Sequence, residues 1–157
     1  MEHDSGAFAQ FYRSSLGQVA RRLILRRVRE IWPSLKGQRL LGYGFAPPYL
    51  RNFLGEAERT IALLPENLGT ATAWPTPNIL LSSSEEAALP LSDALFDRVL
   101  IVHGLELADS LRPLMRQLWR VMAPDGRLLL IVPNRTSLWT QVERSPFAHG
   151  RPFTRVQ

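Results

Sequence analysis

The chain alternates short apolar runs with longer amphipathic stretches, as in proteins whose strands and helices follow one another. Apolar residues recur at helical spacing over residues 15–32, with Ser15 as the expected cap, arginines on the other face, and Pro33 and Gly37 as the stop. A second amphipathic stretch covers residues 109–122. Each stretch predicts a helix. The apolar stripe of the first helix consists of Leu16, Val19, Ala20, Leu23, Val28 and Ile31.

Five short apolar runs read as strands. They are Arg39–Leu41, Thr60–Leu64, Asn78–Leu81, Phe96–Val102 and Arg127–Val132. Pro48–Leu54 predicts a short helix after the first run, and residues 67–77 predict a loop. Continuous apolar strands that alternate with helices favour an α/β fold with a mostly parallel sheet and helices on both faces.

Composition bounds the class of protein. The 157 residues, 45% apolar and 21% charged, suit one ordinary globular domain. The lack of cysteine excludes disulfides and thiolate metal sites, and the three scattered histidines lack metal-ligand spacing, so we expect no metal site. The acidic start and the absence of an apolar run near the ~20 residues of a membrane helix predict a cytoplasmic protein without a membrane partner.

The net charge of +5 raises the question of nucleic acid, because basic patches bind phosphate. Five of the arginines fall on the first predicted helix, and only one of the nineteen basic residues is a lysine, Lys36. We favour a solvated arginine face over nucleic-acid binding. We expect the helix to pack by its apolar stripe over the glycine loop described next.

A glycine pair, Gly42 and Gly44 around Tyr43, stands between the first predicted strand and the helix that follows. Glycine has no Cβ and tolerates positive φ, and a helix start presents unpaired N–H groups. The loop therefore suits close approach of a nucleotide-like ligand at the end of a strand. The alternative is an ordinary tight turn that binds nothing.

Three further motifs support the first reading. The first is Leu89-Pro90-Leu91, and the second, shortly after it, is Phe96-Asp97-Arg98-Val99. The third precedes an apolar strand and reads Leu118-Trp119-Arg120-Val121-Met122-Ala123-Pro124-Asp125-Gly126. Together with the glycine loop, they make residues 38–134 resemble a class I S-adenosylmethionine-dependent methyltransferase of the type 11 kind. The resemblance implies a Rossmann-like sheet, S-adenosylmethionine as cofactor and a small-molecule acceptor. The chain then divides into a basic helical segment (1–36), a methyltransferase core (37–134) and a loop and tail (135–157).

The resemblance also implies roles for particular residues. The backbone of Gly42, Tyr43 and Gly44 would pass the methionine part of the cofactor. Glu66 would hold the ribose, unless it is a surface loop residue. Glu85, with its neighbour Glu86, stands where the family places an acid that accepts from the adenine amino group. His103, after the fourth strand, would face the acceptor.

Several of these residues have a structural alternative. Glu85 reads equally as a carboxylate at a helix N-terminus, and His103 as a polar strand end. We expect Glu106 to face solvent, Asp109 to cap the following helix and Trp119 to pack in the core. If the acceptor must lose a proton, His103 or Tyr43 is the expected base.

The sequence departs from the family pattern at three positions of the cofactor site. Leu40 replaces an acidic residue, Ala46 replaces a third glycine, and the ribose carboxylate is displaced. The family sheet has seven strands, and this chain stops after the fifth, as if truncated. The strand at 127–132 would then be an open edge that invites a second copy, giving a homodimer or aggregation, unless residues 136–157 fold back and cover it. The alternative to an enzyme is a non-catalytic interaction or regulatory protein with the same fold.

Overall fold

A computed structural model describes residues 5–65 and 80–134 and contains a five-stranded parallel sheet. The strands are β1 (Arg39–Gly44), β2 (Arg59–Pro65), β3 (Leu80–Ser84), β4 (Phe96–Val102) and β5 (Met122–Ile131). Their order is β3-β2-β1-β4-β5, and every pair is parallel. The α/β fold with a parallel sheet is therefore confirmed.

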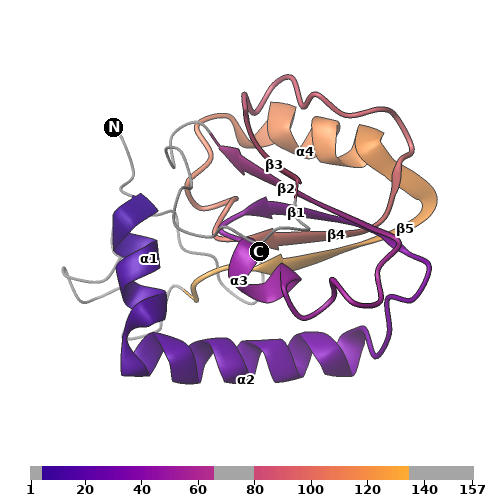
Figure 1. Ribbon diagram of the computed structural model, residues 1–157. Coiled ribbons are helices and arrows are strands. Elements are labelled where there is room, and N and C mark those ends of the chain that lie inside the picture. The colour runs from indigo at the N-terminus through magenta and orange to yellow at the C-terminus, as the bar shows by residue number, and fades with distance from the viewer. Residues whose placement is uncertain (1–4, 66–79, 135–157) are drawn as a thin grey trace.

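Helices cover both faces of this sheet (Figure 1). They are α1 (Ser5–Arg13), α2 (Ser15–Ile31), α3 (Pro47–Leu50) and α4 (Leu111–Val121). α4 lies on one face, α2 and α3 lie on the other, and α1 stands beside the carboxyl ends of the strands (Figure 1). Each face has its own apolar core, because successive strand residues point to opposite sides.

Element boundaries differ from the predictions in several places. α1 was not predicted, and the N-cap of α2 is Ser14, whose hydroxyl accepts from the Gly17 N–H at 3.0 Å, rather than Ser15. β3 runs from Leu80 to Ser84, three residues beyond the expected end at Leu81, and the expected start at Asn78 lies outside the described residues. β5 already begins at Met122, and its pairing with β4 is irregular near Phe96. The loop at 67–77 and the tail at 135–157 lie outside the described residues.

Most of the apolar stripe expected to bury α2 faces outward instead. Leu16, Val19 and Leu23 are 55%, 49% and 63% exposed, whereas Val28 is 2% exposed. The cause is Gly17, where an added Cβ would lie 1.9 Å from the carbonyl oxygen of Phe11. The helix must therefore turn its Gly17 face toward α1.

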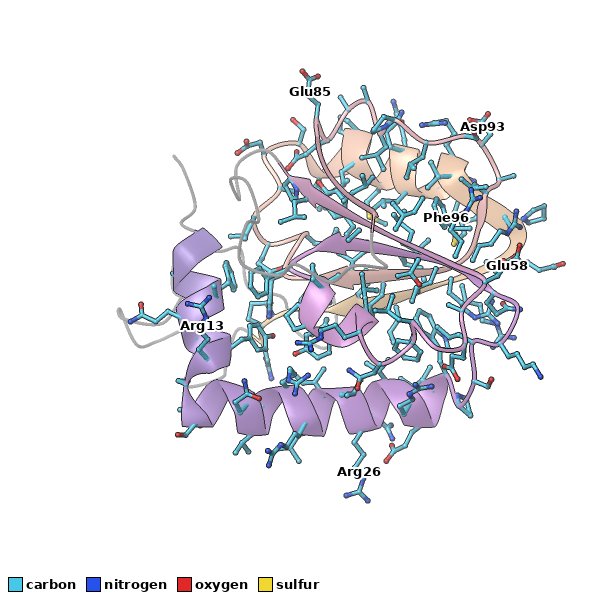
Figure 2. The ribbon with its side chains drawn as sticks, in the orientation of Figure 1. Arg13, Arg26, Glu58, Glu85, Asp93 and Phe96 are labelled. Atoms are coloured by element: carbon cyan, nitrogen blue, oxygen red, sulfur yellow. The ribbon has the colours of Figure 1, made fainter. Side chains whose placement is uncertain are left out.

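Residues at helical spacing from Gly17 then face inward as well. Arg21, four residues after Gly17, and Arg29, next to the buried Val28, stabilise the contact with α3 and the segment after it. Arg21 Nη1 donates to the carbonyl of Pro48 at 3.3 Å, and Arg29 bonds Glu56 and the carbonyl of Asn52. Arg26 points away from the sheet, as expected for a solvated side chain (Figure 2). The expectation of a uniformly solvated arginine face was therefore only partly correct.

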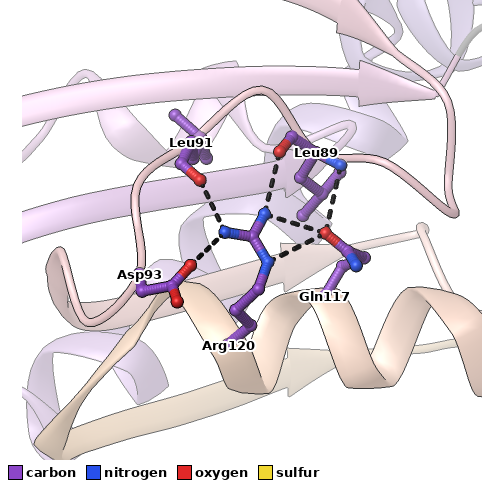
Figure 3. A network of polar contacts seen from close by, with 5 residues as sticks. All are labelled: Leu89, Leu91, Asp93, Gln117 and Arg120. Atoms are coloured by element: carbon purple, nitrogen blue, oxygen red, sulfur yellow. Dashed lines mark hydrogen bonds and ion pairs between the residues drawn. The ribbon is translucent and has the colours of Figure 1, made fainter.

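The segment between β3 and β4 is fixed to α4 by one arginine (Figure 3). Arg120 donates to the carbonyls of Leu91 and Leu89 at 2.8 and 2.9 Å. It also bonds Asp93 and the side chain of Gln117, and the same Gln117 oxygen accepts from the Leu89 N–H at 3.3 Å. A guanidinium has five donors in one plane, so a single side chain can hold several acceptors of a loop at once.

An ion pair joins the starts of β1 and β4. Asp97 Oδ2 accepts from the backbone N–H of Arg39 at 2.8 Å and from its Nε at 3.0 Å, while Nη2 reaches Oδ1 at 3.2 Å. The hydrogen bonds from the Arg39 side chain lower the pKa of Asp97, with the backbone bond and the guanidinium charge acting in the same direction. This pair fixes the two central strands side by side at their amino ends.

We expect Asp97→Asn to lower the free energy of unfolding by about 1 kcal/mol at pH 7, since the pair is partly exposed. Because the folded pKa lies below the unfolded value of about 3.9, the stabilisation is present above that pH and is lost as the pH falls through the folded value. Urea unfolding at pH 7, 5 and 3 should show the wild-type advantage shrinking toward acid. Asp125→Asn, at an exposed position, is the control. An advantage independent of pH would contradict this account.

Candidate functional site

The strand order reverses between β1 and β4, and the site forms where these two strands end. β1 pairs with β2 on one side and with β4 on the other, with Gly44 opposite Val102. In open α/β sheets, ligands bind at the carboxyl ends of strands where the order reverses. At that point the Phe45 N–H donates to the Val102 carbonyl at 2.7 Å.

Both strand ends turn through a left-handed residue. Gly44 has φ 79° and His103, directly after β4, has φ 50°. Side-chain alternation would send Phe45 and His103 to the α4 face. The positive φ values break that alternation, and both rings lie on the α1 side of the sheet. For histidine this backbone costs energy, and such residues concentrate at functional sites.

The two glycines of the loop are required by close packing within the chain. A Cβ on Gly44 would lie 2.3 Å from the Val102 carbonyl oxygen and 2.9 Å from the Cα of Gly104. A Cβ on Gly42 would lie 2.5 Å from the end of the Leu50 side chain. The lack of a side chain thus brings the end of β1 against the end of β4. Contact of this backbone with a cofactor stays a prediction.

We expect Gly44→Ala to lower the free energy of unfolding by more than about 2 kcal/mol, because strain and a backbone clash add. Gly37→Ala isolates the strain, since Gly37 has φ 70° and nothing within 4 Å of its Cβ position. Gly55→Ala, with open space and no positive φ, should have little effect. Chemical unfolding of the three variants provides the measurement. Equal losses for Gly44 and Gly37 would show that the close approach is unimportant.

A buried polar network lies at this strand end. Tyr12, on α1, places its hydroxyl 2.8 Å from His103 Nε2 and 2.8 Å from the hydroxyl of Tyr49, on α3. His103 Nδ1 is 2.9 Å from Glu106 Oε1. Tyr12, Tyr49, His103 and Glu106 are 1%, 0%, 4% and 3% exposed. Three segments distant in sequence therefore meet in one chain of hydrogen bonds.

The environment of this network keeps both tyrosines protonated. Burial is the main cause that raises the pKa of Tyr12, and the neighbouring Tyr49 raises it further. Burial also raises the pKa of Tyr49 to about 12, although the hydrogen bond with Tyr12 and the charge of Arg21 act the other way. Both hydroxyls therefore remain donors at neutral pH.

Aromatic rings surround the network. Phe8 stacks on His103 with ring centroids 5.2 Å apart, and Tyr12 stacks on Phe45 at 5.5 Å. At one end of the network, Glu106 Oε2 is buried without a hydrogen-bond partner. An unpaired buried carboxylate oxygen is costly unless a cation or donor reaches it. A positively charged group that reached this oxygen would therefore be stabilised.

The predicted acidic cofactor residues have different surroundings. Glu66 lies outside the described residues. Glu85 is exposed and points away from the body of the protein (Figure 2). Glu86 accepts from the backbone N–H groups of Asp109 and Ser110 at 2.9 and 2.7 Å, just before α4. Glu86, not Glu85, thus takes the place at a helix N-terminus, and Glu85 keeps its oxygens available.

Tyr43 and His103, the two predicted bases, lie on opposite faces of the sheet. Tyr43 belongs to the α4-side core, and its hydroxyl is buried without a partner. Burial raises its pKa, with the Glu86 charge contributing. A tyrosine in this environment holds its proton more tightly, so of the two only His103 has the surroundings of a base.

Three expectations about single residues were wrong. Glu106 is buried against His103 instead of facing solvent, because the turn after β4 folds it inward. Asp109 does not cap α4; Ser110 occupies the N-cap, without a side-chain cap bond, and Glu86 supplies the nearby acceptors. Trp119 is 76% exposed, since Leu118 and Val121 take the inward positions of α4.

Sequence reasoning missed Tyr12, Tyr49 and Glu106 as site residues. For Glu106 a signal was present: a histidine and an acid three residues apart interrupt an otherwise apolar run. Tyr12 and Tyr49 gave none, because an aromatic residue in an apolar segment is usually part of a core. No metal-binding group of three or more suitable side chains occurs among the described residues. Within that same part of the chain, no helix has the length and apolar character to cross a membrane.

Residues 41–130 match a family model described as a methyltransferase domain, and the chain belongs to this family. Among curated proteins, nothing matches the sequence. The matched range starts after α2, so neither α1 nor Tyr12 is part of it.

Solved structures share the fold. The [4+2]-cyclase SpnF has a TM-score of 0.69 at 23% identity, over 92% of this chain and 56% of its own. A possible histamine N-methyltransferase from Thermotoga maritima has a TM-score of 0.61 at 18% identity, over 94% of this chain and 75% of its own. A putative S-adenosylmethionine-dependent methyltransferase from Methanococcus maripaludis has a TM-score of 0.64 at 13% identity, over 83% of this chain and 64% of its own. The chain spans about half the length of the first solved structures it matches, 50% and 56%.

The family implies S-adenosylmethionine as the cofactor. The residues at the strand ends fit it at one point. Its sulfonium is a cation, and the unpaired oxygen of Glu106 belongs to a carboxylate that can face a positive charge. The ribose carboxylate expected at Glu66 lies outside the described residues.

Proposed function

We propose that the chain is an S-adenosylmethionine-dependent methyltransferase acting on a small-molecule acceptor. The observation that carries this proposal is the His103 network at the reversal of strand order, within a fold and family that imply this cofactor. Bound cofactor would supply an activated methyl group. Holding the acceptor in line with that methyl would then be the main contribution of the protein.

In this proposal the loop at Gly42–Gly44 and Glu85 bind the cofactor, and Glu106 faces its positive charge. The acceptor would lie toward His103. SpnF is a cyclase, so reactions other than methyl transfer occur on the same fold. The non-catalytic alternative is not favoured, because a buried His–Glu pair costs desolvation energy that a purely structural core avoids.

Calorimetric titration tests the cofactor directly. We expect S-adenosylmethionine and S-adenosylhomocysteine to bind the full chain with dissociation constants on the order of micromolar. Glu85→Gln should weaken both, and Glu58→Gln, at an exposed position before β2, is the matched control. Absence of heat at about millimolar ligand would overturn the proposed function.

We also propose that a second copy pairs along β5, as the sequence predicts. Among the described residues β5 pairs only with β4, and Leu130 on it is 41% exposed. A parallel strand with one free side presents unpaired N–H and C=O groups.

The cytoplasmic location expected from the sequence also stays a prediction.

Size-exclusion chromatography with light scattering should show a dimer. Leu130→Lys should shift it toward monomer, because charge on an edge strand opposes pairing. Leu23→Lys, a change at a similarly exposed leucine on α2, should leave the dimer intact. A monomeric wild-type chain would contradict this interface.

A further inference from the structure

We infer that α2 attaches the protein to an anionic membrane by lying along the membrane surface. No residue of the cofactor or acceptor site takes part, so the attachment does not depend on the proposed function. Six large apolar side chains are exposed among the described residues, and four of them lie on this one helix. The four are Leu16, Val19, Leu23 and Ile31. The other two, Trp119 and Leu130, lie singly on α4 and β5.

The four apolar side chains share one face of α2. Successive residues of an α-helix are turned by about 100°, so the four positions fall within an arc of about 120°. Gly17 and Val28 lie outside this arc and are buried. α2 is the outermost layer on its side of the sheet, and no described element lies beyond it (Figure 1). The apolar stripe is therefore a ridge without a partner among the described residues.

The same face carries an excess of positive charge. Arg22, Arg26 and Arg27 are exposed, and Glu30 is the only acid on the helix. Glu30 pairs with both Arg26 and Arg27, so one carboxylate stands against three guanidinium groups. At helical spacing Arg22 and Arg26 border the apolar stripe, and Arg26 points away from the sheet (Figure 2). Such side chains can bury their stems in lipid while the charged ends stay in water.

An anionic lipid surface is the occupant that satisfies both halves of this face. Acyl chains take up the apolar stripe, and lipid headgroups bring negative charge to the arginines. Nucleic acid would pair with the arginines and leave the leucines in water. A second copy packed helix against helix would bring the same arginines together, and like charges repel. The charge of the face therefore favours lipid over these two occupants.

This mode of attachment requires no spanning helix. The sequence-based expectation of no membrane partner rested on the lack of a long apolar run. A helix that crosses the membrane is likewise absent from the part of the chain that the structure describes. A helix in the interface needs only one apolar face beside a charged one, and α2 has both.

Co-flotation of the full chain with lipid vesicles tests the attachment. The probes are vesicles of phosphatidylcholine alone and vesicles that contain roughly 30% phosphatidylserine. We expect the wild type to bind the anionic vesicles more tightly. Leu23→Gln should weaken that binding about 10-fold through lost apolar burial. Arg22→Gln should weaken it about fivefold, and only on anionic vesicles.

The matched controls lie on α4, at the opposite face of the sheet (Figure 1). Trp119→Gln removes an exposed apolar side chain, and Arg116→Gln removes an exposed arginine. Both should leave vesicle binding unchanged. A wild type that ignores anionic vesicles, or controls that lose as much as the α2 variants, would overturn the inference. Circular dichroism of each variant verifies that it folds.

A second experiment reads the position of the helix directly. The chain has no cysteine, so Val19→Cys creates a single thiol for a polarity-sensitive fluorophore. Its emission should move to shorter wavelength when anionic vesicles are added, whereas a label at Arg116→Cys should not respond. Vesicle binding without a shift at position 19 would mean electrostatic adsorption alone and would overturn insertion. A shift that appears without lipid as the protein is concentrated would assign the face to a second copy instead. Neither readout involves S-adenosylmethionine, so failure here leaves the proposed function untouched.

Discussion

The structure depends on the close approach of the carboxyl ends of β1 and β4. A single hydrogen bond, from the Phe45 N–H to the Val102 carbonyl, spans this approach, and it requires a residue without a side chain at position 44. The left-handed turns at Gly44 and His103 lie directly beside it. They carry one ring from each strand out of the alternating pattern and onto the side where α1 stands. The site is therefore a product of two strand ends, not of one loop.

Two arginine contacts hold the frame around this point. Arg39 and Asp97 align β1 with β4 at their amino ends, so the register that places Gly44 opposite Val102 is set from the far side of the sheet. Arg120 fixes the segment before β4 to α4 through two backbone carbonyls. Asp97 and Arg120 both fall within the motifs that carry the family resemblance. Each of these two residues makes hydrogen bonds within the protein. Their presence in the motifs is therefore explained without any contact with a ligand.

Periodicity and motif order were enough to predict the parallel sheet and the helix α4, because a buried strand or one helical stripe is a local property of the sequence. The face that α2 turns toward the sheet is not a local property of the sequence. Gly17 fixes its orientation by contact with Phe11, and an apolar stripe flanked by arginines gives no sign of that contact. Among site residues, Gly44 and His103 could be found from their position after strands. Tyr12 could not, because its role depends on a helix that packs against a strand 91 positions away.

The position of Tyr12 has a consequence for how relatives of this protein should be grouped. The matched family region begins at residue 41, whereas one member of the polar network precedes it. Proteins that agree throughout the sheet can therefore differ in the chemistry at the strand ends, according to what their leading helix contributes. Sorting such sequences by the residue that meets the histidine would separate groups that the shared sheet alone merges.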